Sequence, residues 1–277
     1  MKKLEKPKMS VRNIMQDISE SVSDQKKKTN ITNAIDYIER FADEYDSLAK
    51  NHMLHCIIPT QQTGTALDAT DMKKLYSDKF SKGALKEKYY DKLMALAKNG
   101  KCPICGIGQV SNLDHYLAKS IYPVYAITPT NLTPICRDCN FQKLDKAIEG
   151  YVYSPFHPYY DDIDDMIWLV AKIIKQAEGN LVVEYFVNPD ISQTNSELYN
   201  KMNEHCKLYK LFKLYSIQAS TEIADKIMAW QSFATREGNE KLKNLFKDYL
   251  LTPAGGQKNT WYTALFRALV DNIAIIL

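Results

Sequence analysis

The sequence predicts an α+β protein that is mostly helical, in which a small core with a structural four-cysteine zinc site is embedded in an α-helical surround. Apolar residues recur at the three- and four-residue spacing of amphipathic helices through most of the 277 residues. Short stretches rich in β-branched and aromatic residues, such as 181–187, predict a few strands between these helices. Two Cys-x-x-Cys pairs, Cys102/Cys105 and Cys136/Cys139, mark the core.

The composition is that of a globular protein, with 45% apolar and 25% charged residues. The net charge of +3 is too small to establish a nucleic-acid partner, so any basic surface has to come from local clustering. The first residues contain no apolar signal-peptide segment, and the chain has no run of about 18 apolar residues that would span a membrane. We therefore expect a cytoplasmic protein with no membrane partner.

Four regions are expected in chain order: a polar N-terminal arm (1–28), a helical N-terminal region (29–98), the cysteine-bearing core (99–160) and a mainly helical C-terminal region (161–277). The arm ends in three lysines and is expected to be solvated and partly mobile, with phosphate contact as the alternative. A long amphipathic helix should begin at Thr29 or Asn30, because apolar residues then repeat at helical spacing as far as Ala49.

Lysines accumulate just before the core. Between Lys73 and Lys101, nine lysines face three acidic residues, a local balance of +6. A solvated helix face is the usual meaning of such a pattern. Because this run leads directly into the core, we favour a surface that follows phosphates.

Beyond the core, four aspartates in 161–165 precede the apolar run 166–174. Acidic residues suit the positive end of a helix dipole, so a helix is predicted there rather than a metal site. A strand follows at Leu181–Val187. The remainder is expected to form four helices, one running from Leu198 to Leu211 and the third closed by Pro253 and Gly255-Gly256.

The paired cysteines predict a zinc ion. Each Cys-x-x-Cys pair turns two sulfur atoms towards one ion, and two pairs complete a tetrahedral shell. Four thiolates leave no open coordination position, so this zinc is expected to be structural. It would tie the residues before Asp114 to those around Asn140. A redox pair or two disulfides would be the alternatives, but neither explains why both pairs are present.

Polar residues of the core are candidates for a catalytic site. His115 is suited to take a proton from water near neutral pH. Asp114 and the amide oxygen of Asn140 offer hard oxygen ligands to a cation such as Mg²⁺. The amide of Asn131 can bond the backbone of the 116–130 loop and hold His115 in position. Taken singly, each residue also fits a structural role, as a core histidine, a turn residue or a helix cap.

Together these residues carry a resemblance. The stretch Asp114-His-Tyr-Leu-Ala-Lys-Ser-Ile-Tyr-Pro123, followed by Pro129-Thr-Asn-Leu-Thr-Pro-Ile-Cys-Arg-Asp-Cys-Asn140, resembles the HNH endonuclease family, which has a ββα-metal fold. Asp114-His115, Asn131 and Asn140 match the family pattern, and the cysteine pairs match its zinc-braced members. The resemblance spans Lys101–Lys146 only.

The resemblance implies cleavage of phosphodiester bonds in DNA, with His115 as general base, Asp114 and Asn140 as ligands of a catalytic cation, and Asn131 as a further catalytic residue. Asn140 replaces the more usual histidine, which implies Mg²⁺ or Mn²⁺ as cofactor beside the structural Zn²⁺. The residues expected near the phosphate are basic: Lys119, Arg137, Lys143 and Lys146.

Two other classes remain as alternatives. A zinc-ribbon-like module would bind nucleic acid or protein without cutting it. A zinc nucleobase deaminase is not favoured, because Leu117 stands where its catalytic glutamate belongs. The architecture also resembles nuclease effectors of bacterial anti-phage systems, such as the PtuB-type HNH partner of an ATPase, which implies a partner ATPase or another defence subunit. Restriction and mobile-element nucleases are the alternative settings.

Overall fold

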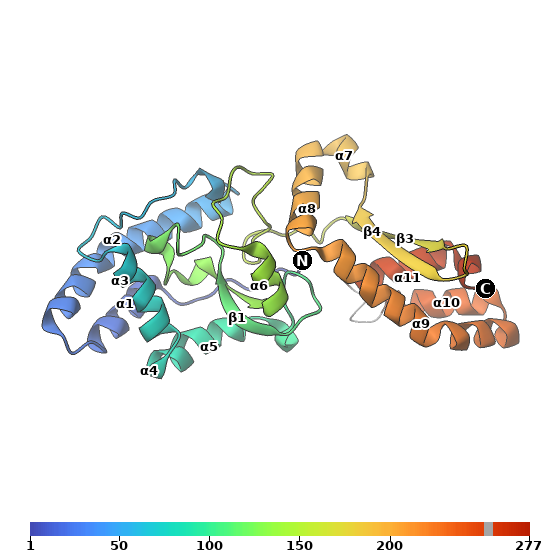
Figure 1. The fold of residues 1–277 in the computed structure, drawn as a ribbon, viewed down its shortest axis with the longest axis horizontal. Helices are drawn as coiled ribbons and strands as arrows, with labels where there is room; N and C mark the ends of the chain where they lie inside the picture. Colours follow the sequence, from blue (N-terminus) through green and yellow to red (C-terminus); the bar gives the residue numbers. More distant parts are fainter. Residues whose placement is uncertain (252–256) are drawn as a thin grey trace. The chain divides into compact units, whose positions relative to one another are not determined.

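The computed structural model describes residues 1–251 and 257–277 (Figure 1). It divides into two compact units, Lys2–Asp161 and Asp162–Leu277, and Met1 groups with the second. Helices predominate among the described residues, and each unit contains one two-stranded antiparallel sheet. The predicted fold class, α+β and mostly helical, is therefore confirmed. None of the described helices is both long and apolar enough to cross a membrane.

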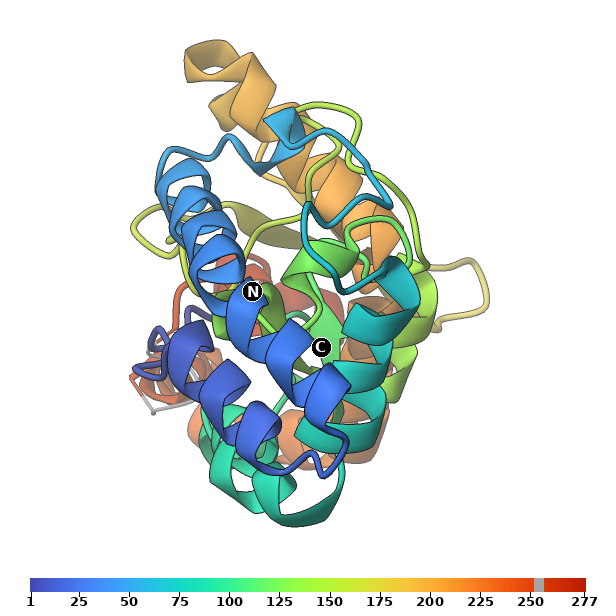
Figure 2. The same ribbon diagram turned by 90° about the vertical axis from the view of Figure 1, so that its left-hand side faces the viewer.

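The first unit begins with two helices that pack side by side, α1 (Val11–Glu20) and α2 (Gln25–Lys50), as Figures 1 and 2 show. The expectation of a mobile arm over 1–28 is therefore wrong, and the long helix begins earlier than predicted. Side chains cap both helices: Ser10 accepts a hydrogen bond from the Asn13 amide, and Asp24 accepts one from the Lys27 amide.

Helix α1 forms because its apolar residues share one face. The residues buried on that face recur at helical spacing: Val11, Ile14, Met15 and Ile18. The chain before α1 is also held, since the Lys2 amide donates to the Pro103 carbonyl at 2.6 Å and the Leu4 amide to the Pro158 carbonyl at 2.8 Å. Burial of this face and these backbone bonds outweigh the polar composition of the segment.

Short helical elements connect α2 to the core. In chain order they are η1 (Leu54–Cys56), α3 (Ala69–Lys74), the π-helical turn η2 (Leu75–Phe80), α4 (Gly83–Leu85), the π-helical turn η3 (Lys86–Tyr90), α5 (Asp91–Met94) and η4 (Lys98–Gly100). A capping box between Asp68 and Asp71 starts α3. The lysine-rich run thus lies on these elements, whose apolar side buries Met72, Phe80 and Leu93.

The cysteine-bearing core contains two strands and one helix. Strand β1 (Val110–His115) pairs antiparallel with β2 (Leu132–Cys136), and helix α6 (Arg137–Lys143) follows β2 directly and packs on both strands. Two 3-10 turns, η5 (Pro123–Tyr125) and η6 (Pro129–Asn131), lie in the loop between the strands. The register pairs His115 with Leu132 and Asp114 with Thr133, so the end of β1 lies at the start of β2.

The second unit contains the hairpin of β3 (Leu169–Lys175) and β4 (Leu181–Val187). The strand predicted at Leu181–Val187 is confirmed, whereas the helix predicted over 166–174 is wrong. An apolar run of this length suits either structure, and the Gly179 turn, with φ of 87°, lets it pair with β4 in unbroken register. The buried Asn259 side chain fixes the start of β3 by accepting from the Trp168 amide at 2.8 Å and the Leu169 amide at 3.1 Å.

Helices complete this unit: α7 (Asp190–Thr194), α8 (Ser196–Leu208), α9 (Leu211–Glu237), α10 (Asn239–Leu250), α11 (Trp261–Asp271) and the 3-10 turn η7 (Ile273–Ile276). Helix α9 packs on β4, and α11 packs on β3. One helix was expected to run through Leu211, but Lys210 adopts a left-handed conformation, with φ of 53°, and separates α8 from α9. The predicted helix end at Pro253 and Gly255-Gly256 lies outside the described residues.

The buried face of α1 gives a test of this fold. Ile14 is fully buried, so Ile14→Ala should lower the free energy of unfolding by about 2–4 kcal/mol. The control is Arg12→Ala on the same helix, which removes only partly exposed ion pairs with Asp36 and Glu39 and should have a much smaller effect on stability. Urea unfolding measures both; an unchanged stability for Ile14→Ala would mean that the helix is not packed.

Candidate functional site

Four cysteines meet in the first unit. Cys102, Cys105, Cys136 and Cys139 are buried, and their Sγ atoms all lie within 4.8 Å of one another. The Cys105 and Cys136 sulfurs are 3.9 Å apart. A tetrahedral zinc with bonds of 2.3 Å places its sulfur ligands about 3.8 Å apart. The cysteines are not joined by disulfides. Their arrangement is therefore compatible with a structural zinc ion, as the sequence predicted.

The backbone around the cysteines is shaped for this cluster. The Gly108 amide donates to the Cys105 sulfur at 3.4 Å, and the Cys139 amide donates to the Cys136 sulfur at 3.5 Å. A Cβ atom on Gly108 would lie 2.9 Å from the Cys136 sulfur, so only glycine fits this approach. Such N–H donors favour the thiolate form that binds metal. The cluster ties the residues before β1 to the junction between β2 and α6.

Asn131 organises the loop between the strands. Its fully buried side chain accepts from the Leu117 amide at 2.7 Å and donates to the carbonyls of Leu117 and Tyr125, both at 3.1 Å. Its own carbonyl accepts from the Tyr116 amide at 2.8 Å, which extends the β1–β2 pairing by one residue. The predicted bonding of Asn131 to the 116–130 loop is thus present, and it fixes the backbone that follows His115.

His115 lies at the end of β1 and is 5% exposed. Its Nε2 atom lies 2.9 Å from the Ala126 carbonyl oxygen, which can only accept. A neutral ring in this position carries its proton on Nε2 and its lone pair on Nδ1. Burial, helped by the charge of Lys119, lowers the pKa of His115 to about 3, so the ring is neutral at pH 7. Neutral imidazole is the form that can accept a proton.

Asp114 forms an ion pair that the sequence did not predict. The Lys143 Nζ atom, carried by α6, lies 2.7 Å from Asp114 Oδ2 and 2.5 Å from the His115 carbonyl oxygen. The Lys143 side chain is 9% exposed and that of Asp114 15% exposed. Burial raises the pKa of Asp114, and the Lys143 charge opposes that rise. An ammonium group therefore lies on the carboxylate that was predicted to bind a cation, whereas Lys143 itself was expected to meet phosphate.

The other predicted residues make no contact of this kind. Asn140 is half-buried on α6, three residues before Lys143 and hence on a neighbouring part of the same helix face. Among the described residues, Asn140 makes no hydrogen bond to Asp114 or His115. Arg137 and Lys146 are exposed, and Lys119 is half-buried. The structure thus brings Asp114, His115, Asn131 and Lys143 together, and Asn140 lies one turn earlier on the helix that carries Lys143.

Tyr76 is the site residue that sequence reasoning missed. Its ring centroid lies 4.5 Å from that of His115, in an edge-to-face arrangement with an interplanar angle of 70°. The Lys119 ammonium lies 5.2 Å from the centroid of the Tyr76 ring. Tyr76 belongs to the π-helical turn η2, a rare element that is frequent at functional sites. No local pattern in the sequence connects residue 76 with residue 115, so this contact could not be predicted.

Comparison with known proteins gives one similarity. The chain is similar to protein Ea31 of Escherichia phage lambda, with 26% identity over 247 residues that cover 84% of this chain and 81% of the relative. The name of that protein states no activity. No family model matches the chain, and no solved structure matches it.

The cysteine cluster predicts the metal content. The purified chain should hold close to one zinc ion, and Cys102→Ser should lose it and unfold at a lower temperature, because zinc binding contributes directly to folding. Cys56→Ser is the matched control, since Cys56 is exposed and lies outside the cluster. Elemental analysis and thermal unfolding measure both. Zinc retained in full by Cys102→Ser would contradict the assignment.

Asn131 gives a second test. Asn131→Ala removes three buried hydrogen bonds and takes away the partner of both the Leu117 amide and the Leu117 carbonyl, so it should cost about 3 kcal/mol of stability. Asn112→Ala on β1 is the control, because within the described part of the chain that amide bonds the Ser111 hydroxyl alone, and it should cost less than about 0.5 kcal/mol. Chemical denaturation compares the two. Equal stabilities of the Asn131→Ala and Asn112→Ala variants would mean that Asn131 does not order the loop.

Proposed function

We propose that this chain is a metal-dependent endonuclease of the HNH type that hydrolyses phosphodiester bonds in DNA. The observation that carries the proposal is the placement of four motif residues on one strand–strand–helix unit. Asp114-His115 ends β1, Asn131 immediately precedes β2, and Asn140 lies on α6. The four-cysteine cluster spans the same unit. A binding module has no need of a neutral histidine next to a carboxylate at this position.

In this proposal His115 is the general base. The Ala126 carbonyl holds the proton on Nε2, so Nδ1 takes the proton from the attacking water. The pKa of about 3 belongs to the chain without substrate. A phosphate anion next to the ring favours the imidazolium form and raises this pKa, so the base becomes stronger when DNA is bound. Tyr76 packs against the imidazole and limits its rotation.

Asp114 and Asn140 would hold the catalytic Mg²⁺ or Mn²⁺. A carboxylate and an amide oxygen are ligands of the type that these cations prefer, and so few protein ligands leave positions for water and phosphate oxygens. When bound, such a cation offsets the negative charge that develops on the phosphate and on the leaving oxygen. In this structure the positive charge beside Asp114 is the Lys143 ammonium. If Asp114 bound a cation instead, this ammonium would be available to a phosphate oxygen.

The other basic residues have a simpler proposed role. Arg137 begins α6 and Lys146 follows the helix by three residues; both are exposed. Lys119 lies over the Tyr76 ring, which packs against His115. Their charges suit contacts with DNA phosphates on either side of the cleaved bond. Such contacts would orient the backbone without selecting a sequence.

A non-catalytic zinc-ribbon module is the second candidate. The observation that favours it is the Asp114–Lys143 ion pair, because a purely structural core also has to neutralise a buried carboxylate. The biological setting stays a prediction from architecture: an anti-phage effector in the cytoplasm with a partner ATPase. The phage origin of the similar protein Ea31 supports a mobile-element nuclease equally well.

Plasmid cleavage tests the proposal. The zinc-loaded chain should nick supercoiled DNA with Mg²⁺ or Mn²⁺ and not with a chelator. His115→Ala should lower the rate by about 100-fold or more, because it removes the general base. His52→Ala is the matched control: His52 is 47% exposed, pairs with Asp161 outside the site, and should keep full activity. Equal rates for the His115 variant and the parent chain would remove His115 from catalysis.

A further inference from the structure

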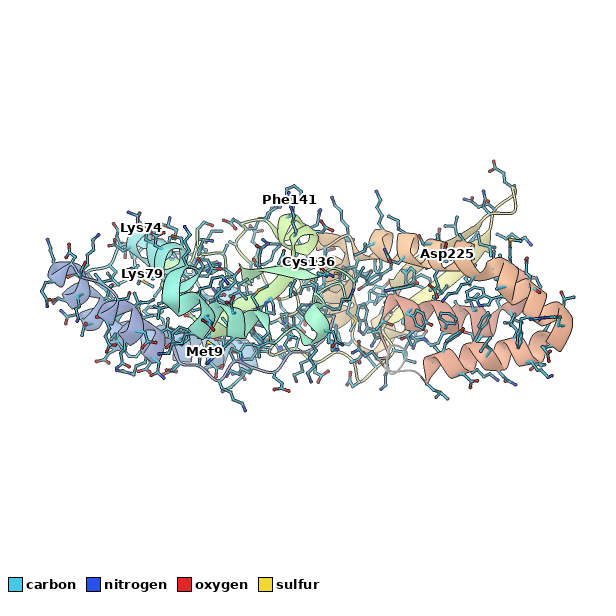
Figure 3. The ribbon with its side chains drawn as sticks, turned by 90° about the horizontal axis from the view of Figure 1, so that it is seen from below. Met9, Lys74, Lys79, Cys136, Phe141 and Asp225 are labelled. Atoms are coloured by element: carbon cyan, nitrogen blue, oxygen red, sulfur yellow. The ribbon has the colours of Figure 1, made fainter. Side chains whose placement is uncertain are left out.

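Helix α6 presents a large aromatic side chain to solvent. Phe141 is 73% exposed, and Leu144, just after the helix, is 55% exposed. Figure 3 shows Phe141 projecting outward from α6, away from the Cys136 end of the helix. Phenylalanine is among the residues most often buried, and this exposed ring is available to a ligand. Its neighbour in the chain is Asn140, one of the proposed cation ligands.

The surroundings of Phe141 are charged rather than apolar. Arg137 is four residues earlier and therefore shares its helix face, and Lys146 follows the helix; both are exposed. Two carboxylates, Asp138 and Asp145, lie in the same segment, and Asp145 accepts a hydrogen bond from the Ser120 hydroxyl at 2.8 Å. Lys74 of α3 projects on the same side of this unit as Phe141 in Figure 3.

An isolated ring of this kind fits a nucleobase better than a protein partner. Protein interfaces bury a contiguous patch of at least several hundred Å², whereas Phe141 and Leu144 are single exposed side chains with charged residues before and after them in the chain. Proteins that bind single strands combine cationic side chains for the backbone with aromatic rings on which bases stack. Phe141 and its neighbours have this combination.

We infer that Phe141 stacks on a nucleobase next to the cleaved phosphate, and that the chain therefore favours DNA whose base faces are accessible, either single-stranded or locally opened. The inference rests on the proposed function, because it places DNA over α6. In an intact duplex both faces of each base are covered by its neighbours, and opening them costs free energy. In a mismatched bubble or a single strand the bases are already accessible, so binding does not require this free energy of opening.

Binding without cleavage tests the inference. The His115→Ala chain, with zinc bound and in buffer without Mg²⁺ or Mn²⁺, is titrated into fluorescein-labelled single-stranded, bubble and fully paired DNA of one sequence, and fluorescence anisotropy is measured. Compared with the His115→Ala chain, the double variant His115→Ala, Phe141→Ala should bind the single strand and the bubble roughly tenfold more weakly, and the duplex should lose far less affinity. Phe141→Trp should restore binding. The control is Ile58→Ala, because Ile58 is 80% exposed in the same unit and should have no effect.

The salt dependence separates stacking from charge. Phe141→Ala removes no ionic contact, so the slope of log affinity against log salt should not change, whereas Arg137→Ala should reduce this slope by about 0.7–0.9. Unchanged affinity of Phe141→Ala for the open DNAs, equal losses on all three DNAs, or no binding of DNA by the parent chain would each overturn the inference. Plasmid nicking by the chain with intact His115 is scored separately, so a nuclease without base stacking is distinguished from a chain that is no nuclease.

Discussion

The four-cysteine cluster is the constraint on which the candidate site depends. Strands β1 and β2 and helix α6 are only five to seven residues long. A two-stranded sheet and a helix of this length are marginally stable in water without further support. One ion held by four thiolates would fix the start of β1 to the start of α6. Strand β1 carries Asp114 and His115, and helix α6 carries Asn140. The close approach of Gly108 to Cys136 indicates how tightly the backbone is fitted around that position.

Burial then sets the chemistry within this frame. Asn131 uses its whole side chain to order the loop after β1, and that loop supplies the carbonyl that orients His115. The cost of burying Asp114 is offset by Lys143, which reaches across from α6. A divalent cation at Asp114 has to displace this ammonium or bind beside it. The ion pair therefore sets how readily the carboxylate becomes available, and it connects the position of α6 with the end of β1.

The sequence predicted those features that depend on local spacing. Cysteine pairs signal a metal cluster by their own pattern, and Leu181–Val187 has a clear strand composition. Helix α1 was missed although its apolar residues have helical spacing, because the charged composition of the segment was given more weight. Strand β3 was taken for a helix because short apolar runs are ambiguous until their partner is known. The Asp114–Lys143 pair and the Tyr76–His115 contact join distant parts of the chain, and no local pattern encodes them.

Asp114 and Asn140 are proposed to form a divalent-cation site separate from the cysteine cluster. Electron paramagnetic resonance of Mn²⁺ titrated into the zinc-loaded chain tests this site, because the signal is independent of cleavage and zinc is silent. One Mn²⁺ should bind per chain, and its binding should be strongly weakened in both Asp114→Ala and Asn140→Ala while the zinc content stays constant. Mn²⁺ binding that is unchanged by both substitutions would contradict it.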